Sequence, residues 1–267
     1  MRTSASCIRW VWAKTCTCAE MADETALSAL AERLQRVRER IRCAAAACGR
    51  NPEDIQLLAV SKFHPGMAVG AAAAAGQFAF GESYVQEARR KQETCAHISG
   101  LEWHLIGHLQ RNKARDAVGR FVLIHSLGTA ALADALQAAL EKAALADTDN
   151  EGAAVRQAVL IQVNIGEEQQ KTGIALKDLP ELAEKVITCG RLRLLGLMAI
   201  PPFFDDPERA RPCFARLREA RDRLADRLGL TLPHLSMGMS GDLEAAVGEG
   251  ATIVRVGTDI FGPRLSP

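Results

Sequence analysis

Short apolar runs alternate with amphipathic stretches along most of the chain. The first regular stretch has apolar residues at steps of three and four: Leu27, Leu30, Leu34, Val37 and Ile41. This spacing places them on one face of a helix, which we predict to run from Met21 to about Gly49. Asp23 and Glu24 lie in its first turn, where the helix dipole favours acidic side chains.

Eight short and mostly apolar runs follow, and turn residues bound them. They predict strands at 56–61, 78–82, 102–107, 121–125, 155–165, 192–200, 234–237 and 252–256. Helices are predicted between them at 65–75, 84–95, 110–118, 129–145, 179–189, 207–228 and 241–248. Strands that are apolar on both faces are typical of a parallel sheet covered by helices.

This alternation predicts the α/β class and, within it, a single (β/α)8 TIM-type barrel with an additional N-terminal helix. Residues 21–267 match the length of about 250 residues that such a barrel has. A doubly wound open sheet has the same alternation and stays open as the alternative. Residues 1–20 do not follow the pattern, so we expect a disordered or misassigned extension there, with a weak targeting peptide as the alternative.

Composition narrows the class of protein. The 267 residues are 48% hydrophobic and 24% charged, with a formal net charge of +1, which is typical of a globular protein. The small net charge gives no reason to expect nucleic acid or a membrane surface as a partner. Of the eight cysteines, the later ones are scattered without paired spacing, and Cys16-Thr17-Cys18 has no second Cys or His pair nearby. We therefore expect reduced thiols, a cytoplasmic location and no metal site.

The strand at 56–61 is followed by a lysine, Lys62, and then by a turn into Pro65. The carboxyl ends of parallel strands are where binding sites of α/β proteins collect. Desolvation lowers the pKa of a lysine, and a neutral amine can form a Schiff base with a carbonyl cofactor. The alternative is an ordinary surface lysine at the end of a strand.

Two loops rich in glycine and hydroxyl groups come near the end of the chain, at 236–242 and at Gly257 and Thr258. They follow the seventh and eighth strands, which neighbour the first strand in a closed barrel. Such loops form phosphate sites in barrels, and here the site would lie beside Lys62. An anion site next to a Schiff-base amine predicts a pyridoxal 5'-phosphate site.

Arg255 lies within the eighth predicted strand. Turned into the barrel, its guanidinium would face the pyridine nitrogen of that cofactor, and its fixed charge would disfavour protonation of the nitrogen. The alternative is a salt bridge to a neighbouring carboxylate.

Several motifs resemble, in order, those of the YggS/PROSC family of pyridoxal phosphate homeostasis proteins. They are Leu58-Ala59-Val60-Ser61-Lys62, 80–87, 103–107, 125–127, 162–165, 196–201, 236–240 and 254–258. The resemblance implies a barrel similar to the N-terminal domain of alanine racemase. It also implies a protein that binds pyridoxal 5'-phosphate, acts in vitamin B6 homeostasis and has no established turnover reaction.

The resemblance further implies which residues bind the cofactor. Pyridoxal 5'-phosphate would be attached to Lys62, with its phosphate held by Ser240, Gly241, Gly257 and Thr258. Ser83, Met237 and Arg255 complete the expected cofactor-binding set, and Ser83 stands where the family usually has Asn. The cofactor's recipients would be pyridoxal-phosphate-dependent apoenzymes, and the protein would be a monomer or would associate weakly.

A racemase or decarboxylase with the same barrel is the alternative function. Racemases of this type carry a further β-domain and a second acid or base, commonly a tyrosine, whereas the one tyrosine here, Tyr84, is expected to pack on its helix. We therefore assign no catalytic residue and favour a protein that is not an enzyme. A sugar-phosphate enzyme with Lys62 as its Schiff-base lysine is a third possibility.

Three other residues are considered as site candidates. We expect His104 to be a hydrogen-bonded strand histidine and His108 to begin a helix. Lys171 resembles part of a recurrent family segment and is interpreted as a loop lysine, with a second anion contact or a transient amine for cofactor transfer as the alternatives.

Overall fold

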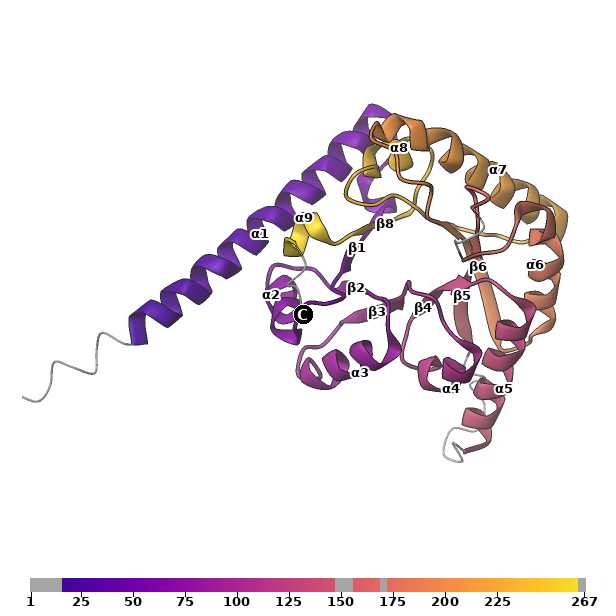
Figure 1. The fold of residues 1–267 in the computed structure, drawn as a ribbon, viewed down its shortest axis with the longest axis horizontal. Helices are drawn as coiled ribbons and strands as arrows, with labels where there is room; N and C mark the ends of the chain where they lie inside the picture. The colour runs from indigo at the N-terminus through magenta and orange to yellow at the C-terminus, as the bar shows by residue number, and fades with distance from the viewer. Residues whose placement is uncertain (1–15, 147–155, 169–171, 264–267) are drawn as a thin grey trace, which may run out of the picture.

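Eight parallel strands close into a barrel in the computed structural model, which describes residues 16–146, 156–168 and 172–263 (Figure 1). The strands are β1 (Gln56–Val60), β2 (Ala79–Glu82), β3 (Glu102–Leu105), β4 (Leu123–Leu127), β5 (Gln157–Val163), β6 (Leu192–Ala199), β7 (His234–Ser236) and β8 (Ile253–Val256). They pair in sequence order, and β1 pairs with β8, with Leu58 opposite Arg255. Closure confirms the predicted (β/α)8 barrel and excludes the open sheet.

Helices surround the barrel (Figure 1). The α-helices are α1 (Cys16–Ala47), α2 (Gly66–Ala74), α3 (Val85–Thr94), α4 (Ala114–Ala117), α5 (Ala130–Ala146), α6 (Leu179–Thr188), α7 (Arg211–Leu228), α8 (Leu243–Gly248) and α9 (Thr258–Phe261). Short 3-10 turns are η1 (Pro52–Asp54), η2 (Arg111–Lys113), η3 (Leu176–Asp178) and η4 (Pro207–Ala210). Helix α1 begins before the predicted start at Met21, and residues 1–15 of the predicted extension lie outside the described residues.

Side chains of each strand alternate between the helices and the inside of the barrel. Outward residues such as Phe80 and Leu197 are fully buried against the helices. A smaller inward cluster fills the barrel: Leu58, Ala79, Leu123, Leu160, Met198 and Ile253. Two residues further along their strands, His125 and Arg255 continue the inward rows. The interior therefore changes from apolar to polar toward the carboxyl ends of the strands.

The C-terminal part of helix α1 lies against one side of the barrel, where the helix contacts α2, α8 and α9, and its N-terminal part extends away from the barrel (Figure 1). Four of the five predicted stripe residues are buried, namely Leu30, Leu34, Val37 and Ile41, whereas Leu27 is 41% exposed, so the apolar face is confirmed from Leu30 onward. The additional helix thus lies behind the loops that follow β7 and β8.

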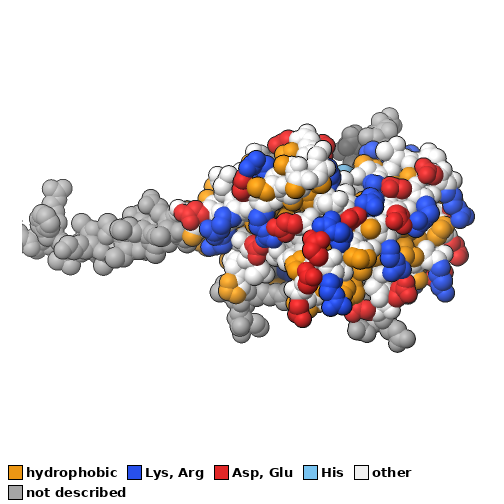
Figure 2. All heavy atoms as spheres, turned by 90° about the horizontal axis from the view of Figure 1, so that it is seen from above, with side chains coloured by type: hydrophobic (Ala, Val, Ile, Leu, Met, Phe, Trp, Pro, Cys, Tyr) orange, Lys and Arg blue, Asp and Glu red, His pale blue; other side chains and the backbone are white. Residues whose placement is uncertain are grey.

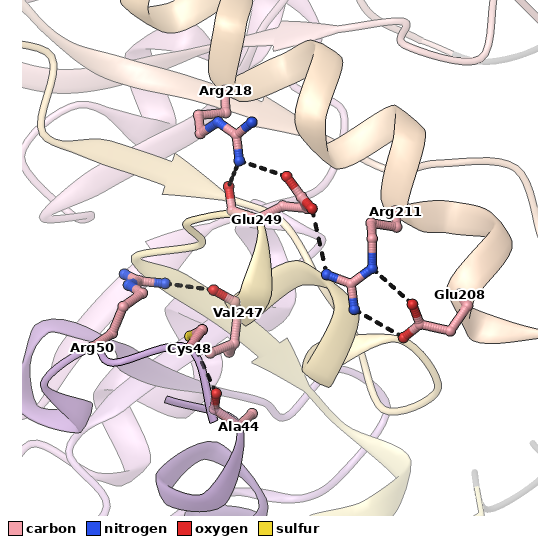
Figure 3. Close-up of polar contacts among 8 residues, drawn as sticks. All are labelled: Ala44, Cys48, Arg50, Glu208, Arg211, Arg218, Val247 and Glu249. Carbon is pink, nitrogen blue, oxygen red and sulfur yellow. Dashed lines mark hydrogen bonds and ion pairs between the residues drawn. The ribbon is translucent and has the colours of Figure 1, made fainter. Parts of the chain in front are cut away.

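A chain of charged side chains ties α7 to the end of α8 (Figure 3). Arg211 binds Glu208 and Glu249, and Arg218 also binds Glu249, with Nη1 to Oε2 at 2.5 Å. Arg50, after α1, donates to the Val247 carbonyl at 2.7 Å. These ion pairs are partly exposed, so solvent screens them and each contributes little to stability.

The distribution of charged side chains on the surface agrees with the small net charge. On the face in Figure 2, acidic and basic side chains are intermixed, with no extended area of one sign. Within the described ranges, no helix is both long and apolar enough to cross a membrane. The cysteines whose side chains are described are free thiols: Cys43, Cys48, Cys95, Cys189 and Cys213.

Candidate functional site

A cavity of about 580 Å³ opens at the carboxyl ends of the strands. Seven of the eight predicted cofactor-binding residues line it: Lys62, Ser83, Ser240, Gly241, Arg255, Gly257 and Thr258. Met237 is the exception, because its side chain is fully buried in the outer core cluster. The alternation of strand β7 explains this difference: the preceding Ser236 contacts the inward-facing His125, so the next side chain points outward.

Lys62 is half-buried and lies in a tight turn directly after β1. The Ser61 amide donates to the Gly81 carbonyl and continues the sheet by one residue, and the His64 amide donates back to the Ser61 carbonyl at 3.0 Å. Phe63 has a φ of 66°, a left-handed conformation that is unusual for a bulky residue. The turn directs the chain sharply away from the sheet at the cavity mouth.

The loops after β7 and β8 form the wall beside Lys62. A Cβ atom at Gly257 would lie 3.2 Å from the Val60 carbonyl oxygen, so a side chain there would crowd the end of β1. Asp242 accepts the Met239 amide at 2.6 Å and so shapes the first of the two loops. Burial raises the pKa of the Asp242 carboxyl.

Arg40 of α1 joins these two loops from behind. Its Nη2 donates to the Ser240 carbonyl at 2.9 Å, and its Nη1 binds Asp259 Oδ2, next to Thr258, at 2.5 Å. Its Nε binds Glu244 Oε1 at 2.7 Å. The helix that precedes the barrel therefore fixes the spacing of the expected phosphate loops.

Arg255 is 4% exposed and contributes to the cavity floor. Its Nη1 donates to Ser236 Oγ at 2.8 Å and its Nη2 to the Ala199 carbonyl at 3.0 Å. Burial lowers the Arg255 pKa to about 10, so the group stays charged at neutral pH. None of the ion pairs within the described part of the chain includes Arg255, so its contacts do not match the salt-bridge alternative.

Two buried histidines extend this arrangement into the barrel. His125 Nδ1 lies 2.8 Å from Ser236 Oγ, and His125 Nε2 lies 3.0 Å from His104 Nδ1. Ser236 Oγ accepts from Arg255 and is also the hydrogen-bond partner of His125, so one hydroxyl joins the arginine to the imidazole. Burial lowers the pKa of His104 to about 4 and that of His125 well below its usual value.

The expectations for the single histidines are met in part. His104 is a strand histidine with a partner on Nδ1, whereas its buried Nε2 has no hydrogen bond among the described residues. His108 does not begin a helix: it lies in the loop before η2 and lines the cavity. Lys171 falls outside the described residues.

Other cavity residues were not among the predicted cofactor-binding residues, although Gln162 and Ile200 lie in two of the motifs that resemble the family. On the far wall, Gln162 Nε2 donates to the Thr172 carbonyl and Oγ1, both at 2.9 Å. The apolar side chains of Ile200, Phe203 and Phe204 border the cavity, and Phe203 is 89% exposed. Ile200 directly follows β6, and Phe203 and Phe204 come after the prolines Pro201 and Pro202.

The donor set in this cavity suits one kind of ligand. It combines an amine, hydroxyl groups, backbone amides next to small residues and a charged guanidinium. A carbonyl compound with a phosphate group and a ring nitrogen would use all of them. The cavity volume is in the range that holds small-molecule cofactors, about 300–1,000 Å³.

Comparison with known proteins gives relatives over most of the chain. The family model of the alanine racemase N-terminal domain matches residues 32–265. A pyridoxal phosphate homeostasis protein of Pseudomonas aeruginosa is 46% identical over 238 residues, 89% of this chain and 97% of the relative. Proteins with the same name from Aquifex aeolicus and Escherichia coli K12 are 44% and 43% identical, over 87% and 88% of this chain and 97% of each relative.

Comparison with solved structures finds proteins of the same fold. PipY of Synechococcus elongatus is 36% identical in its structure with PLP bound, at a TM-score of 0.74, over 87% of this chain and all of PipY (100%). Its structure without PLP gives 37% identity and a TM-score of 0.75 over the same shares of the two chains. The alanine racemase of Corynebacterium glutamicum, at 18% identity and a TM-score of 0.65, covers 89% of this chain and 61% of the racemase, and shares the fold.

Proposed function

The chain belongs to the family of pyridoxal phosphate homeostasis proteins, whose barrel is that of the alanine racemase N-terminal domain, and from this premise we propose how it holds its cofactor. It binds pyridoxal 5'-phosphate, and the attachment point is Lys62. The observation that carries this assignment is that one cavity contains both Lys62 and the two glycine- and hydroxyl-rich loops after β7 and β8.

Each group in the cavity has a distinct task in this proposal. The Lys62 amine attaches the cofactor, and the loops at Ser240 and Thr258 hold its phosphate. Arg255 would face the ring nitrogen, and because its guanidinium stays charged it would keep that nitrogen unprotonated. Bound pyridoxal phosphate supplies an aldehyde that reacts with amines and a ring that can withdraw electrons. The charge on Arg255 would weaken the electron-withdrawing power of the ring and would leave the reactivity of the aldehyde intact.

We propose storage and supply of the cofactor rather than turnover. Tyr84, the one tyrosine of the chain, is 54% exposed and is not among the cavity-lining residues. The protein acts as a cytoplasmic monomer that passes the cofactor to dependent apoenzymes. A racemase-type activity is the second candidate, because His108 and Asp242 line the cavity and could move protons.

Titration of the cofactor-free protein with pyridoxal 5'-phosphate tests this proposal. We expect a visible absorbance band in wild type and in Lys142→Ala, which changes an exposed lysine of α5. In Lys62→Ala the band should be lost. An unchanged band in Lys62→Ala would refute the attachment site. Exchange of amino-acid α-hydrogens with solvent in the loaded wild type would favour the racemase-type activity instead.

A further inference from the structure

A lysine of α3, Lys91, is buried directly beneath the Lys62 turn. Only 5% of Lys91 is exposed, and buried lysines need partners because burial disfavours their charge. The Lys91 ammonium lies 2.6 Å from Glu82 Oε1 and 2.7 Å from Glu87 Oε1. Its third contact is the Ser61 carbonyl at 2.6 Å. All three ammonium hydrogens are therefore used, and one of them holds the residue before Lys62.

The same cluster also holds the residue after Lys62. Glu87 Oε1 accepts the Phe63 amide at 2.6 Å, so one carboxylate binds both Lys91 and the turn. On the other side, Ser61 Oγ donates to Glu82 Oε1 at 2.6 Å. The backbone groups on both sides of Lys62 are thus fixed by side chains that centre on the Lys91 ammonium.

This turn needs such support. Phe63 adopts a left-handed conformation, which is unfavourable for a residue with a side chain. A charge-assisted hydrogen bond contributes in the other direction. The Phe63–Glu87 bond therefore favours this shape of the turn.

We infer that Lys91 is a positioning residue for Lys62: with Glu87 it fixes the turn that presents the Lys62 amine to the cavity. The inference rests on the proposed function. In the step concerned, the Lys62 nitrogen bonds to the aldehyde carbon, and the aldehyde oxygen leaves as water with both nitrogen protons. The cluster does not touch the phosphate loops, so it should affect this step and not the binding of the phosphate.

Two ligands separate these effects. Pyridoxal 5'-phosphate can bond to Lys62, whereas pyridoxine 5'-phosphate has an alcohol in place of the aldehyde and cannot. In Lys91→Met we expect Schiff-base formation, followed by absorbance, to weaken about tenfold to a hundredfold. The Kd for pyridoxine 5'-phosphate, measured by calorimetry, should stay within about twofold of wild type, since no contact to the phosphate loops is lost.

Two further variants complete the design. Glu87→Ala removes the acceptor of the Phe63 amide at a partly exposed position, so it should fold even if Lys91→Met does not, and it should also weaken Schiff-base formation selectively. Arg89→Met is the matched control, because it removes an exposed cation of the same helix that pairs with Glu93. It should behave as wild type.

The outcomes distinguish this inference from the proposed function. Wild-type Schiff-base formation in both Lys91→Met and Glu87→Ala would overturn the role of the cluster alone. Equal loss of both ligands in Glu87→Ala would show general damage to the cavity and would also overturn it. A wild-type protein that binds pyridoxine 5'-phosphate but forms no Schiff base would refute the proposed function itself.

Discussion

The loops that follow β2 and β3 approach each other closely at the cavity wall, and this approach requires a glycine at position 107. The substitution Gly107→Ala tests this requirement. An alanine Cβ at this position would lie 2.2 Å from the Ser83 carbonyl oxygen and 2.6 Å from the Ser83 Cα. Both atoms belong to the backbone, so no rotamer change relieves the contact. The two loops would have to separate by about 1 Å, and overpacking of this kind costs about 1–3 kcal/mol.

For a domain of this size, each kcal/mol lowers Tm by about 2–4 °C, so we expect Gly107→Ala to lower Tm by roughly 2–12 °C in differential scanning calorimetry. Pyridoxal 5'-phosphate binding should weaken as well, because Ser83 and Gly107 both line the cavity. Gly190→Ala is the control, since a Cβ there meets nothing within 4 Å and its φ is not left-handed. Equal Tm values for the two variants would refute the close contact.

Three further substitutions test other parts of the account. In the folded protein the pKa of His104 is lowered from 6.5 to about 4, so the unfolded state takes up a proton at a higher pH than the folded state. The free energy of unfolding of wild type should therefore be full above pH 6.5 and should fall toward pH 4. In His104→Gln this fall should be smaller. At 1.36 kcal/mol per unit of pKa this amounts to about 3 kcal/mol, and identical pH profiles in urea unfolding would contradict it. Arg40→Met should raise the Kd for pyridoxine 5'-phosphate several-fold. It should cost about 1 kcal/mol or less of the free energy of unfolding, because the ion pairs of Arg40 are partly exposed. An unchanged Kd would mean that α1 does not organise the phosphate loops. Leu34→Ala, at a fully buried position of α1, should cost about 2–5 kcal/mol in the same unfolding assay, and a loss below 1 kcal/mol would show that α1 does not pack as described.

The barrel could be predicted from the sequence because its strands are buried on both faces. Apolar runs such as 56–61 and 192–200 therefore contrast sharply with the amphipathic helices between them. Short elements lack such a contrast. Helix α9 (Thr258–Phe261) is too short to show a period, and the helix predicted at 110–118 divides into a 3-10 turn and the single turn α4.

Among the cavity residues, too, some could be predicted from the sequence and others could not. Lys62 and the loops after β7 and β8 could be placed together because closure of the barrel makes β1 and β8 neighbours. Met237 could not be excluded, since its outward direction depends on the register of a three-residue strand. The contacts of Lys91 with Ser61 and of Arg40 with Ser240 join segments that are far apart in the chain. No local pattern marks such pairs, because the closed fold alone brings them together.

Identification of the modified lysine tests the central claim most directly. The protein is loaded with pyridoxal 5'-phosphate, reduced with borohydride, digested and mapped by mass spectrometry. We expect the phosphopyridoxyl mass on the peptide that contains Lys62, at near one group per chain, and little on other lysines. A label spread over surface lysines, or concentrated at a lysine outside the cavity, would contradict the assignment of Lys62 as the attachment point.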